Sequence, residues 1–195
     1  MKALMTFLFL AVAIGAAGFA SRDDWRLLRD WGLLSRKTLQ LPEEPYFEPM
    51  GISYQIALVG FERTFKMEER TDYLVKRPQP RFFGSDEESL ASLEIRGEKK
   101  NIGLAALSVS MPRVMISREN LHTQQTISIN LMKTFLRNTV PGTYPGGWLD
   151  GMIAAYNRGD DISMVKVGSG RKVVIRVDPR MRDTIRLVVT KAGSS

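Results

Sequence analysis

Basic side chains gather near the carboxyl end of the chain, and their spacing predicts a surface that binds anions. Within this stretch the cationic residues are Arg171, Lys172, Arg176, Arg180, Arg182 and Arg186. Lys172, Arg176 and Arg186 fall between apolar positions that alternate with period two, so we expect them on the wet face of a β-hairpin. Guanidinium groups bind phosphate and carboxylate in a two-pronged manner. The six residues are therefore the candidate ligand site; the alternative is a charged edge that prevents strands from aggregating.

Carboxylates near the tryptophan and tyrosine of a short amphipathic segment offer a different chemistry. Asp150, Asp160 and Asp161 lie in the stretch Trp148–Asp161. Two carboxyl groups about 5–10 Å apart hydrolyse glycosidic bonds by acid–base catalysis. A hydrolase of cell-wall or capsular glycan is thus an alternative, although helix-dipole effects, capping and loop solubility also explain these acids.

The sequence lacks the residues that other kinds of catalysis would need. The chain has one histidine, His122, with no second ligand at metal-binding spacing, and we expect it to have a surface or capping role. Ser169 lies between Gly168 and Gly170 in a predicted hairpin turn, which is neither the strand-to-helix setting of a serine nucleophile nor a phosphate-binding loop. We therefore assign no catalytic residue, metal ligand or cofactor, and expect a protein that is not an enzyme.

Length and composition indicate one folded domain. The 195 residues are 44% hydrophobic and 25% charged, which is ordinary for a globular protein. Cysteine is absent, so neither disulfides nor thiolate sites contribute. The net charge of +7 indicates a basic surface. An acidic partner is expected, but no nucleic acid, because the arginine cluster contains no aromatic platform.

The first twenty residues predict export from the cytoplasm. Lys2 precedes an apolar run from Ala3 to Ala17, and Gly18 and Ala20 supply small residues before Ser21, which is the layout of a secretory signal peptide. We expect a periplasmic or secreted protein. The alternative is an uncleaved inner-membrane anchor, with membrane contact through residues 3–20 and the body outside the cytoplasm.

The predicted domain organisation has three parts. Residues 1–20 form the signal peptide or anchor, residues 21–49 a helix (Asp23–Ser35) followed by a proline-rich linker, and residues 50–192 a single domain. The tryptophans of the helix, Trp25 and Trp31, suit either packing on the domain or a membrane surface.

The stretch Leu90–Val140 is the centre of the predicted domain. Alternating apolar residues predict two strands around Leu93 and Leu107, and a helical stripe through Ile127, Leu131 and Phe135 predicts a long helix. The other expected elements are a strand over Ile52–Leu58 that extends towards Met67, a partner strand at Asp72–Arg77, a break over residues 78–89, a second helix around Trp148–Tyr156, and strands over Ile162–Val167, Arg171–Val177 and Thr184–Thr190. This order predicts an α+β fold: a mostly antiparallel sheet with two helices packed on one face, preceded by an N-terminal helix.

The run SLASLEIRG, followed by IGLAALSVSM, a long helix, a short Trp-Leu helix and a closing hairpin, resembles exported proteins of uncharacterised function from alphaproteobacteria. The resemblance covers residues 50–190. It implies a bacterial envelope setting and no particular activity.

From the residues we expect a non-enzymatic extracytoplasmic module that binds an anionic envelope polymer, a lipid headgroup or an envelope protein through the Arg171–Arg186 region. The glycan hydrolase is one alternative. A structural subunit of a membrane-anchored complex is another, because an uncut apolar segment followed by the Trp25–Trp31 helix would hold the domain at a membrane.

Overall fold

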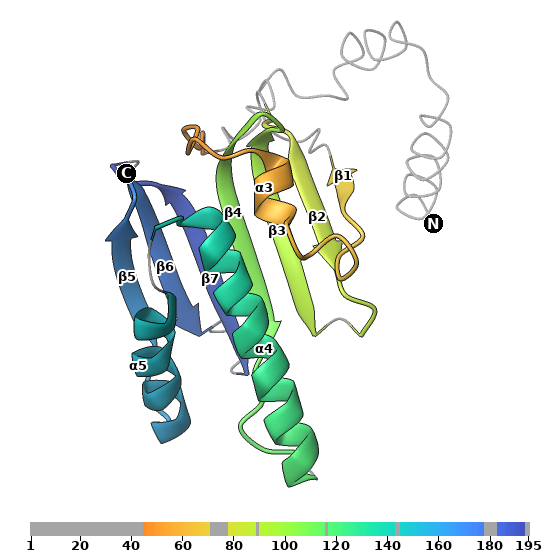
Figure 1. Cartoon of the computed structure of the whole chain (residues 1–195), viewed down its shortest axis with the longest axis vertical. Coiled ribbons are helices and arrows are strands. Elements are labelled where there is room, and N and C mark those ends of the chain that lie inside the picture. The colour runs from red at the N-terminus through yellow and green to blue at the C-terminus, as the bar shows by residue number, and fades with distance from the viewer. Residues whose placement is uncertain are drawn as a thin grey trace, which may run out of the picture. The chain divides into compact units, whose positions relative to one another are not determined.

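The protein folds as an α+β domain around one antiparallel sheet (Figure 1), as the sequence predicted. The computed structural model describes residues 45–70, 78–88, 90–115, 117–142, 145–177 and 183–193. Its strands are β1 (Glu68–Arg70), β2 (Arg81–Ser85), β3 (Ala91–Glu98), β4 (Asn101–Ser110), β5 (Ser163–Gly168), β6 (Arg171–Val177) and β7 (Thr184–Lys191), and its helices are α3 (Tyr54–Leu58), α4 (Arg118–Thr139) and α5 (Pro145–Arg158). The predicted signal peptide, the Asp23–Ser35 helix and the Asp72–Arg77 strand lie outside the described residues.

Two meanders make up the sheet, and one strand pair joins them. The order across the sheet is β1-β2-β3-β4-β7-β6-β5, with every neighbouring pair antiparallel. β4 lies beside β7, and their register places Leu107 opposite Leu187 and Ala105 opposite Val189. The last strand in the sequence thus lies in the middle of the sheet.

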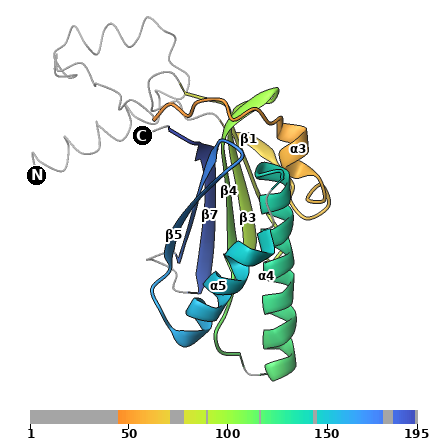
Figure 2. The same cartoon turned by 60° about the vertical axis from the view of Figure 1, so that its left-hand side comes forward.

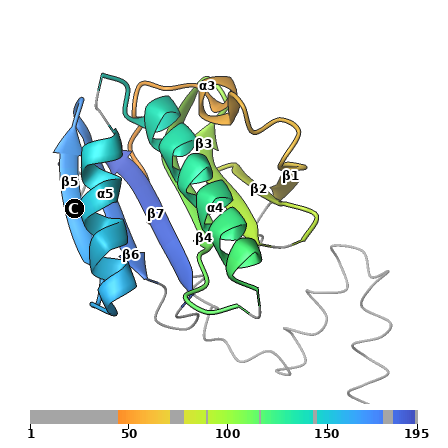
Figure 3. The same cartoon turned by 60° about the horizontal axis from the view of Figure 1, so that its bottom comes forward.

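The helices lie on one face of the sheet, which we call the helix-covered face (Figure 2). The two helices predicted there, α4 and α5, run side by side, with α4 over the middle of the sheet and α5 towards its β5 edge (Figure 3). The short α3 contacts both α4 and β4 on the same face. No helix in the described part of the chain covers the opposite face, which we call the helix-free face.

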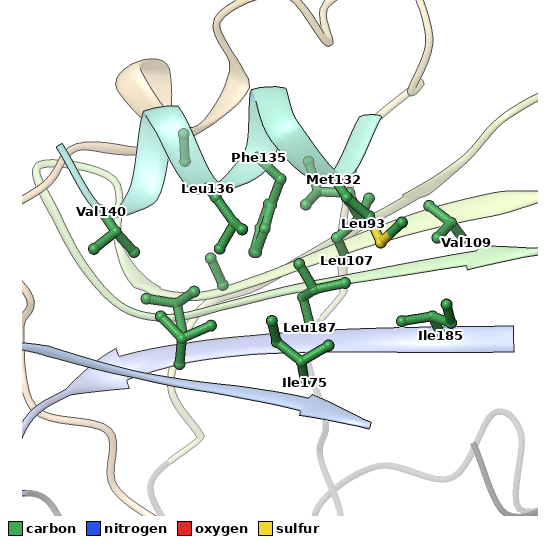
Figure 4. Packing of buried hydrophobic residues seen from close by; sticks show 14 of the residues in the cluster. Leu93, Leu107, Val109, Met132, Phe135, Leu136, Val140, Ile175, Ile185 and Leu187 are labelled. Atoms are coloured by element: carbon green, nitrogen blue, oxygen red, sulfur yellow. The ribbon is translucent and has the colours of Figure 1, made fainter. Parts of the chain in front are cut away.

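Helix α4 supplies the apolar side of the core. Ser117 caps its first turn by accepting a hydrogen bond from the Asn120 amide, and Glu119 and Arg137 carry the charges that the helix dipole favours at each end. Its buried stripe packs against strand residues from both meanders (Figure 4). The contacting side chains in that view include Met132, Phe135, Leu136 and Val140 from the helix side and Leu93, Leu107, Ile175, Ile185 and Leu187 from the sheet.

Two elements differ from the sequence-based expectation. The segment predicted as a strand over Ile52–Leu58 is helix α3, whose first turn is capped by Ser53. The break predicted over residues 78–89 contains strand β2, in which Phe82 is buried opposite Ile95. In the first case a five-residue helix is too short to show a helical period. In the second, flanking prolines and acids hid a strand of only five residues.

The chain enters the domain across the β3–β4 hairpin, where a glycine permits close approach. Met50 donates its amide hydrogen to the Ile102 carbonyl, and the side chain of Gln79 exchanges two hydrogen bonds with the backbone of Phe47. A Cβ atom at Gly103 would overlap the carbonyl group of Phe47. The entry segment can therefore lie flat on the hairpin only because residue 103 has no side chain.

Substituting two glycines with alanine should produce opposite changes in stability. Gly103→Ala forces the entry segment away from the hairpin, and we expect a loss of about 1–3 kcal/mol in the free energy of unfolding. Gly151→Ala, on the exposed side of α5 with no atom within 4 Å of the new Cβ, should add about 0.5–1 kcal/mol. Urea denaturation of both variants measures the two changes, and equal shifts would contradict the packing described for Phe47.

Tyr156 attaches α5 to the end of the sheet where β4 ends and β7 begins. Its hydroxyl donates to the Met111 carbonyl at 2.6 Å and lies 3.4 Å from a carboxylate oxygen of Asp183, while the Arg113 guanidinium sits 4.2 Å from its ring centroid. Burial, followed by the negative charge of Asp183, raises the pKa of Tyr156. The neutral hydroxyl is therefore the form that the folded state favours.

The stability contributed by this hydroxyl should be lost at alkaline pH. Because its pKa is higher in the folded than in the unfolded chain, the contribution is complete below the ordinary tyrosine pKa of about 10 and falls as the pH rises through the raised value. Tyr156→Phe should cost about 1–2 kcal/mol at neutral pH and flatten this alkaline decline. The remaining slope belongs in part to Tyr54, whose pKa burial also raises. Thermal unfolding at pH 7 and above pH 10 measures both effects.

Candidate anion-binding face

Side chains on the helix-free face form rows that cross the strands, because directly paired residues of neighbouring strands point to the same side. The first row reads Arg70, Arg81, Arg96, Leu104, Thr190, Lys172 and Val167. The central row reads Glu68, Phe83, Glu94, Ala106, Val188, Val174 and Val165. The third row reads Ser85, Ser92, Ser108, Arg186, Arg176 and Ser163.

One carboxylate lies among three guanidinium groups at the middle of this face. Glu94 is only 8% exposed, and its Oε1 atom lies 2.7 Å from Arg96 Nε and 3.0 Å from Arg81 Nε. Its Oε2 atom lies 3.3 Å from a terminal nitrogen of Arg186. Three guanidinium groups carry three positive charges and Glu94 carries one negative charge, so these four side chains together retain an excess of positive charge.

The charge excess extends along the three rows. Their charged residues are the basic Arg70, Arg81, Arg96, Lys172, Arg176 and Arg186 and the acids Glu68 and Glu94. Arg176 and Arg186 lie directly opposite each other on β6 and β7. Like charges in such a cross-strand pair repel each other. An anion placed between them would relieve this repulsion and accept hydrogen bonds from both.

Three of the six predicted site residues share the helix-free face. Lys172, Arg176 and Arg186 stand in its first and third rows. The prediction from the alternating pattern that these three side chains share one face of the sheet is therefore confirmed. Arg176 is exposed, whereas Lys172 and Arg186 are half-buried. Arg180 and Arg182 lie outside the described residues.

Arg171 must be removed from the anion-binding set, because the structure places it on the helix-covered face. It is 7% exposed, and its guanidinium donates to the carbonyl groups of Met50, at 3.2 Å, and Thr139, at 2.9 Å. Burial lowers the pKa of Arg171. The residue joins the entry segment, the end of α4 and the start of β6. Its neighbour Lys172 points to the other side because successive strand residues alternate.

The carboxylates of the alternative hydrolase site are exposed and show no described cleft. Asp150 lies on the outer side of α5, and Asp160 pairs with Arg158 at 2.9 Å in the turn that follows. Hollows of about 280, 520 and 610 Å³ occur elsewhere, at the β1–β2 side and around the hairpin lysines Lys99 and Lys100. His122 is exposed on α4, and Ser169, with a φ of 50°, forms the turn between β5 and β6.

Sequence reasoning missed the residues at the centre of the face. The alternation around Leu93 places Glu94 on the wet side of its strand, but two of its arginine partners, Arg81 and Arg186, come from strands before and after it in the sequence. Arg81 was missed because its strand was read as a break. The sequence did contain one signal, because Glu94 is a lone acid between Ser92 and Arg96 on the wet face of its strand. Such a carboxylate needs a positively charged partner, but the sequence does not show which residue supplies it.

Comparisons with protein-family models, with curated proteins and with solved structures gave no match. Among the described residues, no group of three or more histidine, aspartate or glutamate side chains gathers in a way that would hold a metal ion. None of the described helices has the length and apolar character needed to cross a membrane.

Two neighbouring arginines should differ sharply in their contribution to stability. Arg171→Ala leaves two enclosed carbonyl groups without their charged donor, and we expect a loss of about 2–4 kcal/mol in the free energy of unfolding. Arg176→Ala should change it by no more than about 0.5 kcal/mol, because the side chain is exposed. Chemical denaturation of the two variants tests the assignment of Arg171 to the core, and a large loss at Arg176 alone would reverse it.

Proposed function

We propose that the protein is a non-enzymatic extracytoplasmic module that binds an anionic component of the cell envelope through its helix-free face. The observation that supports this most strongly is the charge balance of the three rows on this face, which contain six basic residues and two acids. Arginine is the residue best suited to bind phosphate and carboxylate oxygens.

The third row of the face offers the most direct ligand contacts. Arg176 and Arg186 stand side by side, with Ser108 next to Arg186 and Ser163 next to Arg176. A phosphate or carboxylate above the arginine pair would accept hydrogen bonds from two guanidinium groups and from the flanking hydroxyls. This combination of charge and hydroxyl donors suits a phosphorylated or acidic ligand better than a neutral one.

Charge reversal tests the proposal. Arg176→Glu combined with Arg186→Glu should reduce binding to envelope fractions at low salt by at least about tenfold, because attraction to an anionic surface is worth roughly 1 kcal/mol per basic residue. The matched control is Arg118→Glu combined with Arg137→Glu, which changes the net charge equally at exposed positions of α4 on the other side of the sheet. If both variants lost binding equally, net charge alone would explain it and the face would have no special role.

Removing the carboxylate at the centre should have the opposite effect. Glu94→Gln keeps the shape of the side chain but leaves three guanidinium groups without their counter-charge, so the affinity for an anionic ligand should rise while the fold loses stability. Binding of the folded variant to envelope fractions, with circular dichroism to establish folding, measures this change. Weaker binding by a folded Glu94→Gln variant would argue that Glu94 itself contacts the ligand.

The cellular location belongs to the same proposal and rests on residues 1–20. A short basic start, an apolar run and small residues before Ser21 support export. Amino-terminal sequencing of the protein recovered from its host should begin at Ser21, with the protein in the periplasm or the medium. A full-length product would favour the anchored form, and a cytosolic product would contradict the proposal.

A further inference from the structure

We propose that the anionic partner of the helix-free face is a lipid bilayer, and that the β5 end of this face lies at the boundary between headgroups and acyl chains. This inference rests on the proposed function and names the ligand class for the same face. The observations that carry it are the exposed valines at the β5 edge and the cations beside them.

Apolar side chains continue the central row from the middle of the sheet to its β5 edge. Ala106, Val188, Val174 and Val165 are paired in register on β4, β7, β6 and β5. Their exposure grows towards the edge: Ala106 is buried, Val174 and Val188 are half-buried, and Val165 is 55% exposed. Val167, on the same side of β5, is 65% exposed. The apolar row therefore opens to the outside at one edge.

Cations lie beside this apolar row, and on β6 they stand on both sides of it. On β6, Val174 stands between Lys172 and Arg176 on one face of the strand, and on β7 Val188 stands two residues from Arg186. Long basic side chains reach the phosphate level of a bilayer while their aliphatic stems and neighbouring apolar groups lie deeper. The pattern matches a lipid interface, where phosphate and hydrocarbon occur within a few ångströms of each other.

A soluble polyanion explains only half of this arrangement. An acidic polysaccharide would use the arginines and serines but gain nothing from two exposed valines. A peptide or protein partner generally inserts anchor side chains into pockets, and the described hollows lie at the β1–β2 side and the hairpin tip, away from β5 and β6. A broad surface with apolar residues between cations fits a planar anionic partner best.

The cysteine-free chain allows the orientation to be measured directly. A single cysteine introduced as Val165→Cys carries a polarity-sensitive dye, and Val59→Cys is the matched control, because Val59 is similarly exposed (54%) but follows α3 on the helix-covered side. The protein as isolated from its host is mixed with vesicles of phosphatidylglycerol and phosphatidylcholine, or of phosphatidylcholine alone. Spin-labelled acyl chains report contact with the hydrocarbon.

We expect the dye at position 165 to shift to the blue and to be quenched on phosphatidylglycerol vesicles, with little change at position 59. The shift should disappear when Arg176→Glu and Arg186→Glu are added. A double variant, Val165→Thr with Val167→Thr, keeps the β-branched shape and should weaken vesicle binding by about tenfold, whereas Val59→Thr with Val114→Thr should not.

The outcomes separate this inference from the proposed function. If position 165 stays in water while charge reversal still abolishes binding to envelope fractions, the face binds a soluble anion and the bilayer inference is wrong. If position 59 is quenched instead, the opposite side faces the lipid. If charge reversal alters binding neither to envelope fractions nor to vesicles, the proposed function itself fails.

Discussion

The pairing of β4 with β7 is the constraint on which the rest of the structure depends. It joins a meander from the first half of the domain to a meander from the end of the chain, and it fixes their register residue by residue. Because Leu107 faces Leu187 and Ala106 faces Val188, the apolar sides of both halves meet α4 together and their wet sides form one continuous face. Shifting this register by one residue would turn Lys172, Arg176 and Arg186 towards the core.

The same constraint gives adjacent basic residues different roles. Arg171 and Lys172 are neighbours in sequence, yet one ties three backbone segments together inside the domain and the other lies on the helix-free face. Buried guanidinium groups are stable when their donors meet carbonyl oxygens, as those of Arg171 do. A buried carboxylate likewise needs partners of opposite charge. That of Glu94 is largely enclosed, and three arginines from three different strands neutralise it.

Local patterns predicted the helices and strands that are long enough to show a hydrophobic period. The alternation in β3, β4, β6 and β7 and the helical period of α4 predicted the elements, the α+β class and the common side of Lys172, Arg176 and Arg186. The predicted stripe on α4 was wrong at Ile127, which is exposed. Short elements could not be predicted from their pattern, because the five residues of α3 fit an alternating pattern as well as a helical one. The cluster around Glu94 could not be predicted because its contacts depend on which strands are neighbours, as with Arg186, 92 positions away in sequence.

The position of β7 also has a consequence for how the protein acquires its structure. The strand that joins the two halves of the sheet is the last strand along the described chain, and its pairing with β4 joins residues far apart in sequence. Until β7 is present, the sheet β1–β4 and the hairpin β5–β6 have no strand between them, and β4 and β6 each keep an open hydrogen-bonding edge. Closure waits for the final segment, and topologies dominated by such distant pairings fold slowly.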